Sequence, residues 1–435
     1  MGTPRTRDSV TERLSNALQE RSERARAALG SPLRTTRTTV VIGRLLGAAF
    51  LICFLTGIYS NLLQSPLPWL SPPPGPAHLY AWTQGTHVVV GAMLIPLLLA
   101  KLWVVFPKLF TWPPVRSLPH LLERASLAIL VATALMEPIT GVLNALKWYP
   151  WDFSFRRTHF ALAWVLIGAM IVHIAVHLPA IVRAWRSGGP EDAGEPEHAQ
   201  PPEEKQRPEE AQSPEQDPTE SRDQDADGDQ ADGSPKTTAV SRRRFLGVVG
   251  GASALTGAAA LAHAVTPIGP FSLKAPRARV YAAQGVTVNR SARQAEVTEL
   301  ASDPGWMLRL GTGDGALALK RADLEALPQR SEVLPIACVE GWTIDATWTG
   351  VRLRDLLDLV GMPEDATIRL RSMQRRGAFR ETTMPAAYAR DPRTLIALRL
   401  NGEPLDLDHG YPARVIAPGR PGVLQTKWLE SIEVA

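Results

Sequence analysis

The stretch Pro335-Ile336-Ala337-Cys338-Val339-Glu340-Gly341-Trp342 decides how the C-terminal part of this chain is interpreted. Cys338 is one of only two cysteines in 435 residues, and the other, Cys53, lies far upstream in an apolar run. A lone thiol in this setting is either a small buried hydrophobe or a thiolate that binds a metal or acts as a nucleophile. The segments that follow Cys338 favour the second interpretation.

Further segments follow Cys338 in a fixed order. They are Trp348-Thr349-Gly350-Val351-Arg352-Leu353, Leu400-Asn401-Gly402-Glu403-Pro404, His409-Gly410-Tyr411-Pro412-Ala413-Arg414 and Lys427-Trp428-Leu429-Glu430-Ser431-Ile432-Glu433-Val434. Together with Cys338 they resemble the molybdopterin domain of the sulfite oxidase family. In that family the cysteine thiolate ligates molybdenum, and the later segments wrap the pterin and its phosphate. The resemblance therefore implies that Cys338 is the molybdenum ligand and the centre of catalysis.

The resemblance also implies a molybdopterin site, residue by residue. Arg414 suits a phosphate or a pterin oxygen because its guanidinium presents a fork of donors. Leu424 departs from the family pattern, since a basic residue often stands there, and fewer charges would then hold the phosphate. Taken alone, Lys427 is also compatible with a solvated charge and His409 with a turn residue. The implied pterin contacts are Asn289, Ser372, His409, Arg414, Gln425, Thr426 and Lys427.

The residues around the predicted site bear on the substrate. The segment Val339-Glu340-Gly341-Trp342 resembles bacterial periplasmic members more than animal and plant sulfite oxidases, whose cysteine is followed by an Arg-containing segment. Sulfite is therefore not favoured as the substrate. A cluster of arginines downstream is either an anion pocket or a solvated strand edge: Arg371, Arg375, Arg376 and Arg380.

Composition excludes some classes of function. The chain has 47 Lys and Arg against 43 Asp and Glu, and the basic residues are not gathered on one element, so we expect no nucleic-acid partner. Two cysteines exclude a disulfide scaffold. Hydrophobic residues make up 45% of the chain but are distributed unevenly, which divides it into regions.

The N-terminal region contains apolar stretches of the length that a bilayer requires, about 20 residues. They predict an all-α, four-helix transmembrane bundle within residues 39–183, preceded by a basic leader over 1–38. The positive-inside rule puts the leader in the cytoplasm. The loop 147–157 is an exception to this rule, because it carries positive charges on the side predicted to be outside. The predicted spans lie near 39–60, 84–106, 121–146 and 158–182.

Histidines within these spans are a second chemical signal, because ionisable groups in a membrane are costly and usually functional. His87 and His159 are predicted near the outer face, while His173 and His177 share one face of the fourth span. The pattern resembles membrane cytochromes b of the di-haem type, including b561-like ones, in which facing helices supply axial imidazoles.

The first span has no histidine, which departs from that pattern, so one haem b or two remain open. His120 is a candidate partner for an inner pair, and all these histidines are also compatible with plain interhelical hydrogen bonding. Glu137, beside Pro138, either serves quinone or proton traffic or is a packing residue.

Residues 184–240 are rich in Pro, Glu, Asp, Gln and Ser, which predicts a disordered linker. The motif Ser241-Arg242-Arg243-Arg244-Phe245-Leu246-Gly247 opens an apolar run over 241–266 that matches a twin-arginine signal or the basic flank of a fifth span. Whether it is cleaved stays open. Either interpretation delivers residues 267–435, an expected α+β domain, to the outer face.

The sequence therefore predicts an enzyme of the cell (inner) membrane: a molybdenum-dependent oxidoreductase that transfers oxygen atoms and exchanges electrons with the quinone pool through haem b. We expect a small-molecule substrate, with reduction of S- or N-oxides favoured by resemblance alone. The alternatives are oxidation of a small reduced substrate, a non-catalytic membrane protein that keeps the fold, and a quinone-linked cytochrome with a structural cap.

Overall fold

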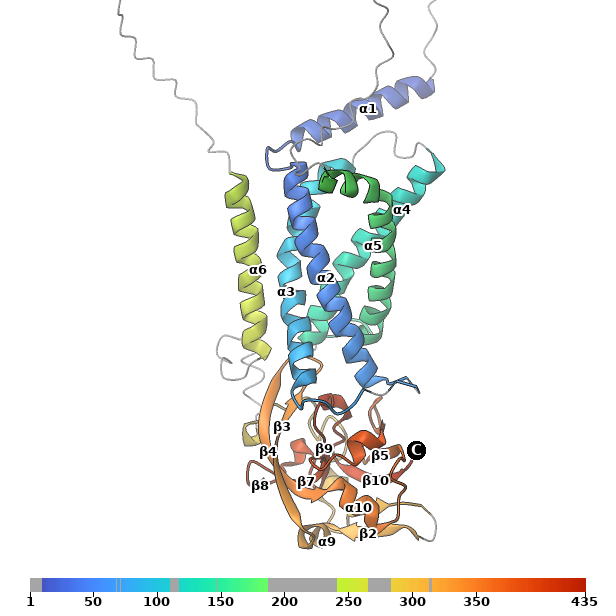
Figure 1. The fold of residues 1–435 in the computed structure, drawn as a ribbon, viewed down its shortest axis with the longest axis vertical. Helices are drawn as coiled ribbons and strands as arrows, with labels where there is room; N and C mark the ends of the chain where they lie inside the picture. Colours follow the sequence, from blue (N-terminus) through green and yellow to red (C-terminus); the bar gives the residue numbers. More distant parts are fainter. Residues whose placement is uncertain are drawn as a thin grey trace, which may run out of the picture.

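The computed structural model describes residues 10–67, 69–70, 72–109, 117–146, 148–186, 241–264, 283–312 and 315–435. A helical N-terminal region lies end to end with a β-rich C-terminal domain (Figure 1). This order confirms the expected division into helical and mixed regions. Residues 187–240 of the expected linker lie outside the described residues, as do 265–282, which include the last two residues of the expected signal and the start of the expected C-terminal domain.

Among the described residues, five helices are long and apolar enough to cross a membrane, α2 to α6. Antiparallel neighbours pack as α2 on α3, α4 on α5, and α6 on α3. A sixth helix, α1, was not expected in the basic leader, and it lies across the end remote from the C-terminal domain (Figure 1). The helices are α1 (Val10–Ala28), α2 (Thr36–Gln64), α3 (Leu79–Val105), α4 (Leu118–Ala145), α5 (Phe155–Arg186) and α6 (Arg242–Ala264).

Each expected span overlaps one helix, and most of these helices continue for a few residues beyond it. The reason is local: helical hydrogen bonding extends past the apolar window until a cap ends it. Thr35 caps α2 by accepting a hydrogen bond from the Thr38 amide, and Ser117 caps α4 by accepting one from the His120 amide.

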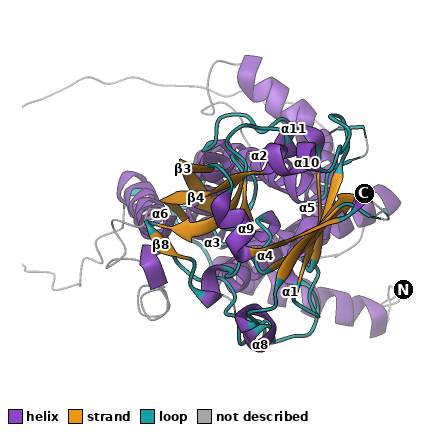
Figure 2. Ribbon diagram, turned by 90° about the horizontal axis from the view of Figure 1, so that it is seen from below, coloured by secondary structure: helices purple, strands orange, loops and turns teal. Residues whose placement is uncertain are grey.

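The C-terminal domain contains two sheets, seen from below in Figure 2. The first has the strand order β2-β1-β10-β5-β6, and β1 runs parallel to β10. The second has the order β3-β4-β7-β8, with β9 paired to β7, and its pairs are antiparallel. The strands of the first sheet are β1 (Met307–Leu310), β2 (Leu317–Lys320), β5 (Ile368–Ser372), β6 (Glu381–Met384) and β10 (Leu429–Val434). Those of the second are β3 (Gln329–Ala337), β4 (Thr343–Arg352), β7 (Leu395–Leu400), β8 (Glu403–Pro404) and β9 (Arg414–Ile416).

The main hydrophobic core joins strands of both sheets with the short helices of this domain. Leu308 and Ile368 from the first sheet, Ile396 from the second, and Leu356 from the helix Leu353–Leu359 are all fully buried in it. Burial alternates along β1 and β5, as a half-buried strand requires, whereas β7 is buried along most of its length. The other short helices are α8 (Thr298–Ser302), α9 (Arg321–Ala326) and α11 (Ala386–Ala389), and Leu353–Leu359 is α10.

The two regions meet where α2 ends and α3 begins. Residues 72–78 of the connection between these helices lie on the C-terminal domain: Gly419 donates its amide hydrogen bond to Ala77 O at 3.1 Å, and the Tyr388 hydroxyl donates to Pro73 O at 3.2 Å. The imidazole of His78 lies 2.8 Å from the Asp345 carboxylate. The C-terminal domain is therefore held directly against the helical region.

Candidate functional site

Cys338 sits in the tight connection between β3 and β4. The two strands pair up to Ala337 and Thr343, and residues 338–342 close the hairpin. The Cys338 amide donates to Trp342 O at 2.9 Å, and the Gly341 amide donates to Cys338 O at 3.0 Å. Gly341 has φ +95°, a conformation that favours glycine. These bonds fix the backbone that carries the thiol, whose residue is only 2% exposed.

The Cys338 hairpin has the C-terminal domain on one side and the helical region on the other. Cys338 packs with Ile336 and Trp342 in one hydrophobic cluster. Its neighbour Ala337 packs instead against Leu63 and Tyr80 from the helices. Both cysteines of the chain are described and neither forms a disulfide, so the thiol remains available as a ligand.

Lys427 contacts two of the other predicted pterin residues, Asn289 and Ser372. Its Nζ donates to Asn289 Oδ1 at 3.3 Å, to Arg290 O at 2.5 Å and to Asp408 O at 2.9 Å. The Ser372 hydroxyl donates to Lys427 O at 2.7 Å. The interpretation of Lys427 as a solvated charge is therefore wrong, because its ammonium is drawn in toward oxygens from two separate segments.

Arg414 is the second cation of this region and, unlike Lys427, it is fully buried, with 2% exposure. It donates to His409 O at 3.1 Å and to Gln425 O at 3.3 Å, and its guanidinium lies 4.8 Å from the centre of the Trp348 ring. Burial lowers the pKa of Arg414 to about 9. Its Nε is buried and makes no hydrogen bond within the described residues. A buried cation with an unused donor is suited to an anionic group such as a phosphate.

The remaining predicted residues support the backbone of the same region. His409 is buried at the end of a 3-10 turn, Leu407–His409. The Gln425 amide bonds both the N–H and the carbonyl of Ala417 at 2.8 Å. The Thr426 hydroxyl lies 3.0 Å from that of Thr382. Gln425 and Thr426 therefore hold the terminal segment in place through protein contacts.

The region around Lys427 and Arg414 reaches the Cys338 hairpin across the second sheet. Arg414 covers Trp348, which shares a hydrophobic cluster with Cys338. A Cβ on Gly422 would lie 2.9 Å from Ala337 O, so the turn Gly422–Leu424 rests directly on the end of β3. A thiol at one end and two cations at the other form a donor set that fits a molybdenum-bearing pterin with a phosphate.

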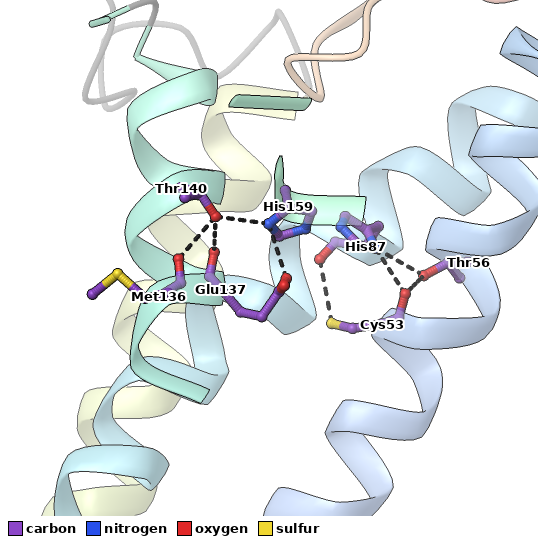
Figure 3. Close-up of polar contacts among 7 residues, drawn as sticks. All are labelled: Cys53, Thr56, His87, Met136, Glu137, Thr140 and His159. Atoms are coloured by element: carbon purple, nitrogen blue, oxygen red, sulfur yellow. Dashed lines mark hydrogen bonds and ion pairs between the residues drawn. The ribbon is translucent and has the colours of Figure 1, made fainter. Parts of the chain in front are cut away.

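A second candidate site lies inside the helical region. The imidazoles of His87 on α3 and His159 on α5 point toward one another, with ring centroids 6.0 Å apart and planes at 82° (Figure 3). Nδ1 of His87 lies 3.0 Å from Cys53 O and 3.2 Å from the Thr56 hydroxyl, both on α2. Sequence analysis predicted the two histidines at one depth, and the structure brings them together.

His159 is anchored in the same way by α4. Its Nδ1 lies 2.9 Å from a carboxylate oxygen of Glu137 and 3.1 Å from the Thr140 hydroxyl (Figure 3). Metal-binding imidazoles usually donate their second N–H to a carboxylate or a backbone carbonyl, which orients the ring and leaves the other nitrogen as a ligand. Glu137 is thus a partner of His159, a contact that the sequence did not reveal; its spacing from Thr140, one helical turn, was the available signal.

Other predicted residues are not brought to this pair. His173 is half-buried on α5, about 21 Å along the helix from His159. His120 is half-buried at the start of α4, and the side chain of His177 lies outside the described residues. A second histidine level stays a prediction.

The arginine cluster downstream of Cys338 behaves as a strand edge. Arg371 and Arg369 both pair with Glu381, at 3.4 and 3.3 Å. The other members are exposed: Arg375, Arg376 and Arg380. The anion-pocket interpretation of these four residues is therefore not supported, because Arg371 is already paired with Glu381 and the other three are exposed.

Comparisons with known proteins agree with the C-terminal geometry. Residues 295–435 match the family model of the oxidoreductase molybdopterin binding domain. Mitochondrial sulfite oxidase of Drosophila melanogaster is 35% identical over 32% of this chain and 27% of its own length. The uncharacterized oxidoreductase YuiH of Bacillus subtilis (strain 168) is 31% identical over 29% of this chain and 64% of its own length. The C-terminal region is a molybdopterin oxidoreductase domain related to sulfite oxidases.

A further relative also matches part of the chain. The "Putative protein-methionine-sulfoxide reductase subunit YedZ1" of Azospira oryzae is 30% identical over 26% of this chain and 42% of its own length. The chain thus spans between about a quarter and just under two thirds of the length of these relatives.

Proposed function

We propose that this chain is a membrane-anchored, molybdenum-dependent oxidoreductase that exchanges electrons with the quinone pool through haem b and acts on a small molecule. One observation carries the proposal. The Cys338 hairpin contacts the face of α3 that also carries His87: Gln84, one turn before that histidine, donates to Val339 O at 2.8 Å. The two candidate cofactor sites are therefore neighbours across one domain contact.

The C-terminal site supports the molybdenum part of the proposal. The Cys338 thiolate would hold the metal, and Lys427, Arg414 and Asn289 would hold the pterin and its phosphate. Molybdenum bound there supplies two-electron oxygen-atom transfer. The protein contributes a fixed thiol on a closed hairpin and a buried, positively charged end for the phosphate.

The histidine pair supports the haem part. The two imidazoles, whose ring centroids are 6.0 Å apart, would hold a haem iron through the nitrogens that do not contact α2 or α4. Bound haem would supply one-electron transfer there. Gly57 leaves room beside His87, since a Cβ there would lie 3.3 Å from Cε1 of that ring, whereas a Cβ on Gly141 would make only an ordinary contact of 3.5 Å with His159 Cε1. One haem between His87 and His159 is therefore the proposed minimum.

The arrangement of the helices supports an outer location for the C-terminal domain. The Arg-rich start of α6 at Arg242 and the leader helix α1 lie at the end remote from that domain (Figure 1). Basic flanks stay in the cytoplasm. We therefore propose that the chain lies in the inner membrane with its molybdopterin domain on the outer face, and that the start of α6 is the twin-arginine motif or the flank of a fifth span.

The relatives support two directions of electron flow. The name of the Azospira relative favours reduction of S-oxides, and by extension N-oxides. Sulfite oxidases among the relatives favour the second candidate, oxidation of a small reduced substrate. We propose the reductase, because the segment after Cys338 lacks the arginine that the sulfite-binding members carry there.

The proposal is tested on the purified full-length protein. We expect about one molybdenum and at least one haem b per chain, and reoxidation of the pre-reduced haem by S- or N-oxides. Cys338→Ser should abolish that reoxidation, while the control change Val333→Ser, at an exposed position of the preceding strand β3, should leave it intact. Full activity in Cys338→Ser would falsify the molybdenum assignment. Haem reduction by sulfite, with no response to any oxide, would reverse the direction.

A further inference from the structure

A cavity of about 310 Å³ lies between the helical region and the C-terminal domain. Its walls come from the end of α2, the start of α5, the strand β6 and the segment around residue 420. Lys427, His87 and His159 do not line it, but it borders the terminal segment of the predicted pterin site, because Leu424 and Thr382, the partner of Thr426, are in its wall. The side chains that decide its chemistry are Arg156, Arg157, Arg420, Glu381, Phe379 and Tyr388.

Arg420 is the most informative of these side chains, because it is a buried cation with 4% exposure. Its Nε donates to Leu424 O at 3.1 Å and one terminal nitrogen donates to Thr383 O at 2.6 Å. The other terminal nitrogen has no hydrogen-bond partner among the described residues, and no described carboxylate pairs with Arg420. Burial lowers its pKa to about 10, so it stays charged at neutral pH. A buried charge without a counter-charge is costly.

The helical region adds two more cations to the same cavity. Arg156 donates to the Gln64 side-chain oxygen at 3.0 Å and lies 5.7 Å from the centre of the Phe379 ring, so these two contacts are to neutral groups. Neither Arg156 nor Arg157 forms an ion pair with a described residue. Both stand in the first turn of α5, where unpaired backbone N–H groups add positive potential.

The acidic side chain in the wall does not balance these charges. Glu381 already pairs with Arg369 at 3.3 Å and with Arg371 at 3.4 Å on β5. The cavity therefore contains three guanidinium groups, while the Glu381 carboxylate in its wall is already paired with two arginines that do not line the cavity. Arg156 and Arg157 also lie on the predicted outer side of the membrane, where the positive-inside rule predicts few positive charges. A bound anion would offset these charges.

We propose that this cavity between the two regions binds a small oxyanion, such as a carboxylate, sulfonate or phosphate group, held by Arg156, Arg157 and Arg420. Guanidinium forks match such groups with paired hydrogen bonds. Phe379 and Tyr388 supply an apolar wall for an organic body attached to the anion. The site takes residues from both regions, so it is complete only when they are docked, and it does not depend on the haem or molybdenum assignments.

Inorganic sulfate is the probe for this site. The thermal unfolding midpoint of the full-length protein is measured in maltoside micelles against sulfate concentration, with ionic strength held constant by NaCl. We expect a saturable rise for the parent and for Arg375→Gln, which removes an exposed arginine elsewhere on the same domain. In Arg156→Gln/Arg157→Gln the half-saturating concentration should rise at least tenfold.

Arg420→Lys keeps the charge and removes the fork, so it should also weaken sulfate binding. The double variant changes side chains at the surface of the cavity and carries the test if Arg420→Lys does not fold. A parent without a saturable response, or a double variant with the parent's half-saturation, would overturn the proposal. Loss of the response in Arg375→Gln alone would move the site to the strand edge and overturn it as well.

The source of the oxyanion is resolved by the lipid. Maltoside micelles contain no phosphate, whereas nanodiscs of phosphatidylglycerol offer a headgroup phosphate at the level where α2 ends. If the headgroup is the resident ligand, sulfate half-saturation rises in the nanodiscs for the parent and not for the double variant. If the ligand is a soluble anion, the parent gives the same value in both media. Each result supports the site and assigns its source.

Discussion

Gln84 on α3 donates a hydrogen bond of 2.8 Å to the carbonyl of Val339, the residue that directly follows Cys338. Gln84 is 6% exposed, so this bond is formed in a dry contact. One turn further along α3, Val88 packs closely on Gly341: a Cβ added to Gly341 would lie 2.8 Å from Cγ2 of Val88. His87 stands between these two contacts. The hairpin of the predicted metal ligand is thus fastened to the turn of helix that carries a predicted haem ligand.

The first prediction concerns that bond. Gln84→Ala should slow reoxidation of the haem by substrate roughly three- to tenfold, since a hydrogen bond contributes about 0.5–1.5 kcal/mol net. The rate with a soluble dye as electron donor to the C-terminal domain should not change, because that route bypasses α3. The measurement is stopped-flow absorbance of the haem against dye-linked turnover. Equal losses by both routes would show a general defect instead of a docking role.

The second prediction concerns Glu137. Its carboxylate lies 2.9 Å from Nδ1 of His159 and makes that imidazole a more basic ligand. Glu137→Gln should keep the haem but raise its reduction potential by on the order of 60 mV, a tenfold change in a one-electron equilibrium. Spectroelectrochemical titration measures the shift. As a control, Glu123→Gln makes the same chemical change near the other end of α4 and should not change the reduction potential. If Glu137→Gln does not change the potential either, the contact between Glu137 and Nδ1 of His159 does not tune the haem.

The sequence predicted some of these features and not others, and the reason is physical. Apolar runs and matched depth were enough to predict the helical region and the pairing of His87 with His159. The partners Glu137 and Thr140 depend on how α4 rotates against α5, which no run of hydrophobic residues specifies. Gln84 carried a signal that was not used, since a polar side chain inside an apolar span needs a partner.

The C-terminal domain shows the same limit. The sequence predicted the α+β class of this domain, and short helices such as Arg321–Ala326 and Leu353–Leu359 are formed by local contacts. The parallel pairing of β1 with β10 joins residues far apart in the chain, and local pattern says nothing of it. The cavity lined by Arg156 and Arg420 could not be predicted from local pattern either, because its charges come from both regions of the chain.

The third prediction concerns acid stability. Burial opposes ionisation of Asp391, but its hydrogen bonds and ion pair with Arg393 outweigh this and lower its pKa. The Asp391 carboxylate therefore stabilises the fold above its unfolded pKa, and this contribution is lost as pH falls through the lower, folded value. Thermal midpoints measured from neutrality down through pH 4 should fall less steeply in Asp391→Asn than in the parent. Identical slopes would show that other carboxylates control acid unfolding.

The last prediction concerns the cation at the expected phosphate end. Lys427 donates to oxygens of Asn289, Arg290 and Asp408, so its ammonium joins the early and late segments of the predicted pterin site. Lys427→Met keeps the apolar stem and removes the charge. Hydrogen bonds from charged groups contribute about 1.5–3 kcal/mol, so pterin and molybdenum content should fall roughly ten- to a hundredfold. Content is read by metal mass spectrometry and by fluorescence of the oxidised pterin. Lys320→Met, at an exposed lysine of the same domain, should keep full content. A fully loaded Lys427→Met protein would mean that this lysine serves only to join the two segments.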